Sequence, residues 1–75
     1  MTSYEILKDT LLKIDTDVEQ DHFVSETRWL EVERAIEEHA GRGELLQDEL
    51  LQLRGLLDEL RLEHDLRMNP GTLGS

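Results

Sequence analysis

Leucines recur along the second half of the chain at intervals of four and three residues. The stripe consists of Leu46, Leu50, Leu53, Leu57 and Leu60. This heptad spacing is typical of a helix that buries one side against a neighbour, and it predicts a helix over 44–67. Further leucines at 45, 51, 56, 62 and 66 widen the apolar surface, so we expect this helix to contact more than one neighbour.

A second apolar stripe precedes a glycine-containing turn. Trp29, Val32 and Ile36 repeat with helical spacing, and Gly41-Arg42-Gly43 follows them. Glycine is the preferred residue where a helix ends in a left-handed conformation, so a turn between helices is expected there. The pattern predicts an antiparallel hairpin of helices at about 17–40 and 44–67.

The N-terminal segment carries a stripe of its own, at Tyr4, Leu7, Leu11 and Ile14. It predicts an amphipathic helix over about 3–14, with Thr2 and Glu5 as a capping box at its start. This helix can fold back on the hairpin as a third helix, or two chains can bury all the stripes together. We expect an all-α fold and a dimeric helical bundle.

The boundaries of the fold are less sharply marked. Residues 15–27 are rich in aspartate, β-branched and hydroxyl residues, and the sequence leaves open whether they form helix or loop. Asn69-Pro70-Gly71 ends the last helix. We predict a single helical domain at 1–68 and a flexible C-terminal tail at 69–75.

Gly55 interrupts the long leucine-rich helix. Glycine in a helix interior destabilises it by roughly 1 kcal/mol relative to alanine, so a reason for its presence is expected. Reflection of the hairpin about Arg42 sets Gly55 opposite Trp29. Either the missing side chain leaves space for the indole, or another helix crosses closely at this point.

Acidic residues dominate the charge of the 75-residue chain. It contains 18 Asp and Glu against 8 Lys and Arg, a net charge of −10. This balance disfavours direct binding to nucleic acid or to an anionic membrane and favours a partner with a basic surface. The absence of cysteine excludes disulfides and thiol chemistry. With no signal peptide and no apolar run long enough to span a membrane, we expect a cytoplasmic protein.

Two patterns suggest metal ligands without completing a site. Five carboxylates occupy positions 1, 3, 5, 7 and 12 of an EF-hand-like loop: Asp15, Asp17, Glu19, Asp21 and Glu26. Gln20 stands where that loop needs glycine. The step from Glu19 to His22 also resembles bundle metal sites, and the hairpin brings His22 towards His64. We predict no cofactor and no metal; the residues that could act as ligands if a metal did bind include Asp15, Asp17, Glu19, His22, Glu26 and His64.

The sequence contains no nucleophile elbow and no phosphate-binding glycine loop, so we predict that the protein is not an enzyme. Our hypothesis is a protein–protein interaction module of the adaptor or small-chaperone type. Its predicted partner-binding residues are Glu26, Glu31, Glu33, Glu37, Glu38, Leu51 and Leu62. Its predicted core and dimer residues are Tyr4, Leu7, Leu11, Trp29, Val32, Ile36, Leu46, Leu50, Leu53, Leu57 and Leu60. The first alternative is an inhibitor that presents residues 15–38 as a nucleic-acid mimic to a DNA- or RNA-handling protein, and the second is a metal-binding helical bundle.

Overall fold

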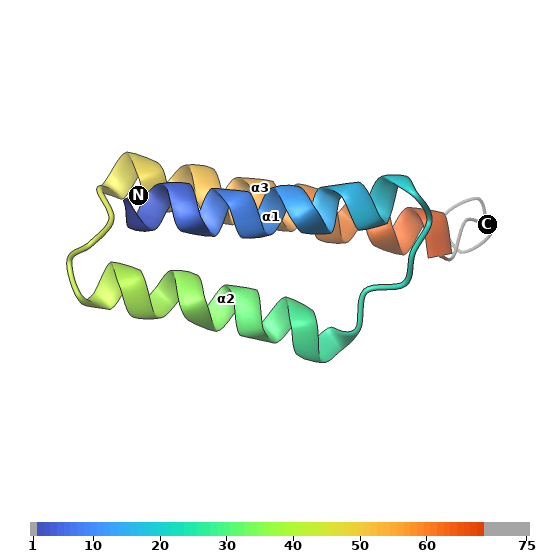
Figure 1. The fold of residues 1–75 in the computed structure, drawn as a ribbon, viewed down its shortest axis with the longest axis horizontal. Coiled ribbons are helices and arrows are strands. Elements are labelled where there is room, and N and C mark those ends of the chain that lie inside the picture. The colour runs from blue at the N-terminus through green and yellow to red at the C-terminus, as the bar shows by residue number, and fades with distance from the viewer. Residues whose placement is uncertain (1, 69–75) are drawn as a thin grey trace.

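The computed structural model describes residues 2–68, which form three helices joined by two short connections. The helices are α1 (Ser3–Glu19), α2 (Glu26–Gly41) and α3 (Gln47–Met68). They lie side by side, and α2 runs in the opposite direction to α1 and α3 (Figure 1). The all-α prediction is confirmed for this part of the chain. The predicted tail at 69–75 lies outside the described residues.

The first helix extends beyond its predicted end at residue 14 and stops at Glu19. Its end is a Schellman motif: His22 N–H donates to the Asp17 carbonyl at 2.8 Å, and Asp21 N–H donates to Val18 at 3.1 Å. Asp21 takes the left-handed conformation, with φ 59°. The undecided stretch is therefore helix up to Glu19, a connection over 20–25, and helix again from Glu26.

The second helix ends at the predicted glycine turn. Gly43 has φ 75°, and its N–H donates to the Ala40 carbonyl at 3.1 Å. Glu44 N–H donates to His39, also at 3.1 Å, which repeats the geometry at the end of α1. The turn prediction is confirmed. The two helices that flank the turn begin later than the predicted residues 17 and 44, because Ser25 and Leu46 stand immediately before their first turns.

Side chains satisfy free backbone N–H groups at each helix start. The hydroxyl oxygens of Thr2 and Ser25 accept from the N–H groups three residues ahead, at 3.2 and 3.3 Å. At α3, the Glu49 carboxylate reaches back to the N–H of Leu46 at 3.0 Å. These caps explain why α2 starts at Glu26 although helical apolar spacing begins before it.

All three helices contribute to one apolar core. Its buried members are Leu7, Leu11, Ile14, Val18, Val24, Trp29, Val32, Ile36, Leu53, Leu57 and Leu60. Tyr4 and Leu50 pack against this core while partly exposed. The Tyr4 hydroxyl donates to Gln52 Oε1 at 2.7 Å, which ties α1 to α3. Leu46 differs from the prediction: it is 71% exposed because it precedes the first turn of α3.

The N-terminal helix packs within its own chain. Four of its side chains are buried, and α1 contacts both α2 and α3. Of the two arrangements open to the sequence, a third helix on the hairpin describes the single chain. The predicted dimer stays a prediction, and the burial of α1 no longer requires it.

The predicted pairing of Trp29 with Gly55 is wrong. The Trp29 ring lies 5.6 Å from the His64 ring, more than two helical turns beyond Gly55. A Cβ atom built on Gly55 meets nothing within 4 Å. Reflection about Arg42 failed because the connection between the helices extends to Leu46, which shifts their register.

Over residues 2–68, no helix is both long enough and apolar enough to cross a membrane.

Candidate partner-binding surfaces

The helix α3 carries leucines on two opposite sides. Leu53, Leu57 and Leu60 are buried in the bundle. Leu51 and Leu62 are each 60% exposed, and Leu66 is 39% exposed. Leu51 and Leu62 are eleven residues apart, about three helical turns, so they lie on one side of the helix. Gly55 and Leu66 each follow one of them by four residues, and we call these four positions the outer face of α3.

Carboxylates accompany these leucines. Asp58 and Glu59 lie between Gly55 and Leu62 along the helix, and Asp48 lies one turn before Leu51. All three are exposed, and none takes part in an ion pair among the described residues. The outer face of α3 is therefore apolar with uncompensated negative charge beside it.

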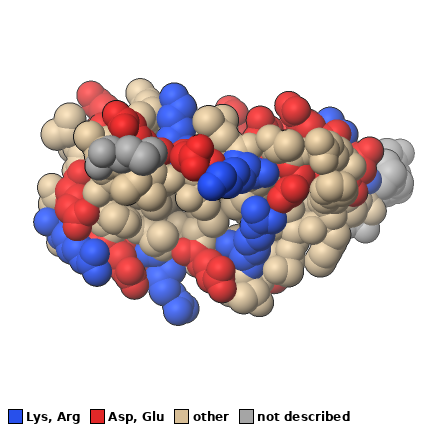
Figure 2. All heavy atoms as spheres, viewed as in Figure 1, with Lys and Arg blue, Asp and Glu red and all other residues tan. Residues whose placement is uncertain are grey.

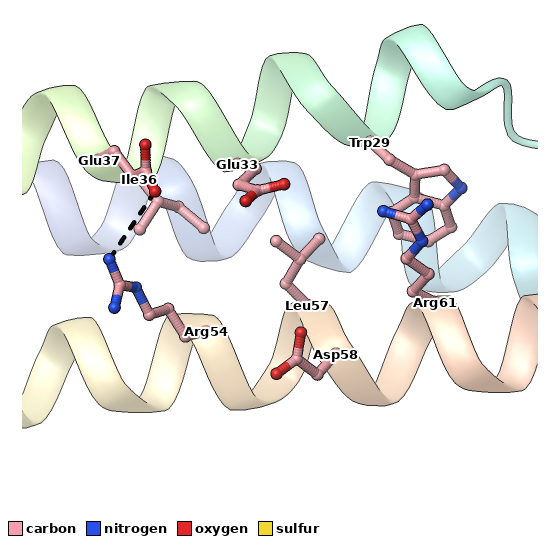
Figure 3. A pocket seen from close by; sticks show the side chains of 8 residues that line it. All are labelled: Trp29, Glu33, Ile36, Glu37, Arg54, Leu57, Asp58 and Arg61. Carbon is pink, nitrogen blue, oxygen red and sulfur yellow. Dashed lines mark ion pairs between the residues drawn. The ribbon is translucent and has the colours of Figure 1, made fainter.

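A groove of about 400 Å³ lies between α2 and α3 (Figure 3). Trp29, Ile36 and Leu57 form its apolar part. Its polar lining consists of Glu33, Glu37, Arg54, Asp58 and Arg61. The groove is open to solvent along one side of the bundle, and its apolar residues already belong to the core.

Both arginines of this groove have acidic partners on α2. Arg61 donates to the two Glu26 oxygens at 2.6 and 2.9 Å. Arg54 lies 3.9 Å from Glu37, the ion pair drawn in Figure 3. These pairs cross from α3 to α2, so the arginines reinforce helix packing and leave little positive charge to attract an anion.

The glutamates predicted to mimic nucleic acid do not share one side of α2. Glu33 and Glu37 line the groove, whereas Glu31 and Glu38, seven residues apart, lie on another side. Glu26 and Glu37 are paired with arginines. On the face shown in Figure 2, acidic and basic side chains lie side by side. The charge is less segregated than the linear sequence indicates.

One predicted metal ligand, Asp17, takes part in a helix–helix contact instead. Arg28 Nη1 donates to Asp17 Oδ2 at 2.7 Å, which joins the end of α1 to the start of α2. His22 Nδ1 lies 3.5 Å from the other carboxylate oxygen. The hydrogen bond from Arg28, helped by His22, holds the pKa of Asp17 below its usual value, against a smaller opposing effect of burial.

The other candidate ligands do not assemble. Asp15 and Glu19 lie in α1, so the start of the EF-hand-like stretch is helix rather than loop. Glu26 is bound to Arg61, and His64 is buried while His22 is exposed. Within residues 2–68, no three His, Asp or Glu side chains are grouped so that they could hold a metal ion.

His64 occupies a position that the sequence analysis did not assign to the core. It is 5% exposed, and its Nε2 accepts a hydrogen bond from the Val24 N–H at 3.0 Å. The rings of Trp29 and Phe23 each lie 5.6 Å from its ring. A signal was present, because His64 follows Leu60 by four residues and continues the buried stripe.

Comparison of the chain with protein-family models, with curated proteins and with solved structures found no match. The functional assignment therefore rests on the surfaces described above.

Proposed function

We propose that the protein is a non-catalytic protein–protein interaction module of the adaptor or small-chaperone type. It docks a partner through the outer face of α3. The observation that carries this proposal is the exposure of Leu51 and Leu62 on the side of α3 that faces away from the core. An isolated exposed leucine is ordinary, but leucines aligned on one helix side are typical of a contact surface.

The polar groups support a binding role over catalysis. Among the described residues, His64 is the only buried side chain with an ionisable group. One of its ring nitrogens is already hydrogen-bonded to the backbone, and the rings of Phe23 and Trp29 each lie 5.6 Å from its ring. The carboxylates lining the α2–α3 groove lie at an open surface, and one of them, Glu37, is paired with Arg54, so a proton-transfer role has little support there.

The test is capture from a lysate of the cells that naturally make the protein. The tagged chain is compared with Leu51→Gln/Leu62→Gln. The matched control is Leu12→Gln/Leu30→Gln, because Leu12 and Leu30 are 47% and 48% exposed on α1 and α2. We expect one set of proteins to be retained by the wild type and the control and lost from the α3 variant. Equal retention by all three would contradict the proposal.

The alternative, nucleic-acid mimicry by α2, has weaker support. Its carboxylates are divided between two sides of the helix, and two of them are paired with arginines. Binding by charge mimicry would weaken steeply with salt, whereas leucine-mediated docking would not. Retention that disappears in Glu31→Gln/Glu38→Gln, but persists in the α3 leucine variant, would favour the mimic.

A further inference from the structure

We infer that the outer face of α3 binds an amphipathic helix of another protein. The apolar stripe of this partner helix is flanked by lysine or arginine, and the partner helix packs closest to α3 at Gly55. This inference deepens the proposed function and rests on it. It specifies the chemistry of the partner and the position of closest contact.

Gly55 has no explanation inside the chain. Positive φ is found at Gly43 but not at Gly55, so the backbone does not require glycine there. A Cβ atom built on Gly55 meets no atom within 4 Å, so packing inside the chain does not require glycine there either. The residue is exposed in the interior of a 22-residue helix. Close approach from outside the chain is the remaining use of glycine at this position.

Gly55 also lies between two bulky side chains. Leu51 precedes it by one turn, and Leu62 follows it by two turns on the same side. The absent side chain leaves a notch between exposed leucines, into which one large apolar side chain of a partner helix fits. The outer face runs from residue 51 to residue 66, about 22 Å at 1.5 Å per residue. A partner helix of about 15–18 residues covers that length.

Charge decides which kind of helix fits. Asp48, Asp58 and Glu59 lie beside the leucines without ion pairs in the described part of the chain. The arginines of α3 are directed elsewhere: Arg54 and Arg61 to α2, and Arg67 to Asp21 and Glu63. A partner with basic residues beside its apolar stripe would compensate the free carboxylates, and acidic flanks would be repelled.

The same charges argue against a second copy of this chain. An antiparallel pair of α3 helices that places Leu62 on the partner's notch also places Leu66 against the partner subunit's Leu51. The midpoint of that pairing falls between residues 58 and 59, so the carboxylates of both copies would meet at its centre. Like charges in contact oppose association.

The experiment measures binding of the full chain to synthetic helical peptides of about 18 residues by fluorescence anisotropy. The first peptide has leucines at helical spacing with lysine flanks. The second replaces each lysine by glutamate, and the third has the composition of the first with the leucines scattered. We expect the first to bind at least about tenfold more tightly than either of the others. Equal binding of the first and third peptides would overturn the inference.

Variants then locate the contact. Gly55→Leu fills the notch, and we expect it to weaken binding of the first peptide by about tenfold or more. Asp58→Asn/Glu59→Gln should reduce the dependence of binding on salt. Leu12→Gln, on α1, should bind like the wild type. Unchanged affinity in Gly55→Leu, with its helicity intact by circular dichroism, would overturn the proposed crossing point.

Two results separate the partner class from the proposed function. If lysate capture depends on Leu51 and Leu62 but the lysine-flanked peptide does not bind, the interaction function stands and the basic partner is wrong. Light scattering tests the second copy. The inference would be overturned if the wild type had a mass of about 17 kDa, twice the 8.7 kDa chain, and Gly55→Leu had the mass of one chain. That result would assign the outer face of α3 to self-association.

Discussion

His64 joins the α1–α2 connection to α3 through a single buried hydrogen bond. Its Nε2 accepts from Val24, so the ring nitrogen at that position carries no proton. Its Nδ1 has no hydrogen-bond partner, with the Asp65 carboxylate 3.6 Å away. The imidazole therefore acts as a core residue whose polar edge satisfies the backbone.

Replacing His64 by phenylalanine should destabilise the fold by about 1–3 kcal/mol, because it keeps a ring in place but leaves the Val24 N–H buried without an acceptor. Urea unfolding measures the change. The control is His22→Phe at an exposed position, where we expect a change within about 0.5 kcal/mol. Equal effects of the two substitutions would show that the hydrogen bond to Val24 contributes nothing.

The Asp17–Arg28 contact should make the coupling between α1 and α2 dependent on pH. The pKa of Asp17 in the folded protein lies below the ordinary value of 3.8, chiefly because of its hydrogen bond with Arg28. A lowered pKa stabilises the folded state at any pH above 3.8, and this stabilisation is lost as the pH falls through the folded value.

A double-mutant cycle of Asp17→Asn and Arg28→Gln isolates this contact from the effect of removing each charge alone. We expect favourable coupling in thermal unfolding at neutral pH and none once Asp17 is protonated. Coupling that stays constant across this range would mean that the carboxylate charge is not responsible.

At the scale of the elements, two helices end in the same hydrogen-bonded motif with different residues. The left-handed position is Gly43 after α2 and Asp21 after α1. A Cβ atom destabilises this conformation, so glycine marks it in a sequence and aspartate does not. The turn at 41–43 was therefore predictable, whereas the end of α1 was not.

Two glycines of this chain should respond to alanine in opposite directions. Gly43→Ala places a Cβ atom on a backbone with φ 75° and should destabilise the protein by about 1 kcal/mol. Gly55→Ala meets no neighbouring atom in a helix interior and should stabilise it by up to about 1 kcal/mol. Chemical denaturation of both variants tests the pair. Destabilisation by Gly55→Ala would show that its surroundings are more crowded than the structure indicates.

The leucines of α3 show how far sequence reasoning reaches. The buried side followed from the spacing of Leu53, Leu57 and Leu60, because apolar positions at three and four residues share a helix side. The position of Gly55 relative to Trp29 could not be predicted from the spacing of residues in the sequence. It depends on where each helix begins, and the caps at Ser25 and Glu49 set those starts. Contacts between elements thus required the structure, whereas the choice of buried side did not.

The whole molecule buries the N-terminal stripe without a second chain. A spacing pattern records that a helix side is apolar but not which surface covers it, so the sequence could not separate a third helix from a dimer. In the structure α1 takes the position beside α2 and α3. Leu12, Leu30 and Leu46 are exposed elsewhere on the molecule, whereas Leu51, Leu62 and Leu66 are exposed together along one side of α3. The aligned leucines available to a partner are thereby reduced from three predicted stripes to the outer face of α3.

A net charge of −10 on 75 residues should oppose the folded state through mutual repulsion. The ion pairs are exposed or half-exposed, so each contributes little to stability. Salt therefore costs little stability by screening these pairs, and it gains more stability by screening the repulsion among unpaired carboxylates. We expect the melting temperature to rise by roughly 2–5 °C between about 20 and 500 mM NaCl.

The control for this salt effect is Glu31→Gln/Glu38→Gln, which removes two exposed carboxylates that have no ion pair in the described chain. At low salt this variant should melt above the wild type, partly because Glu38 lies in the last turn of α2, where negative charge is unfavourable. Its gain on adding salt should be smaller than that of the wild type, since less repulsion remains to be screened. A melting temperature that falls with salt in the wild type would mean that the ion pairs joining the helices, rather than the excess of carboxylates, dominate the electrostatics of the fold.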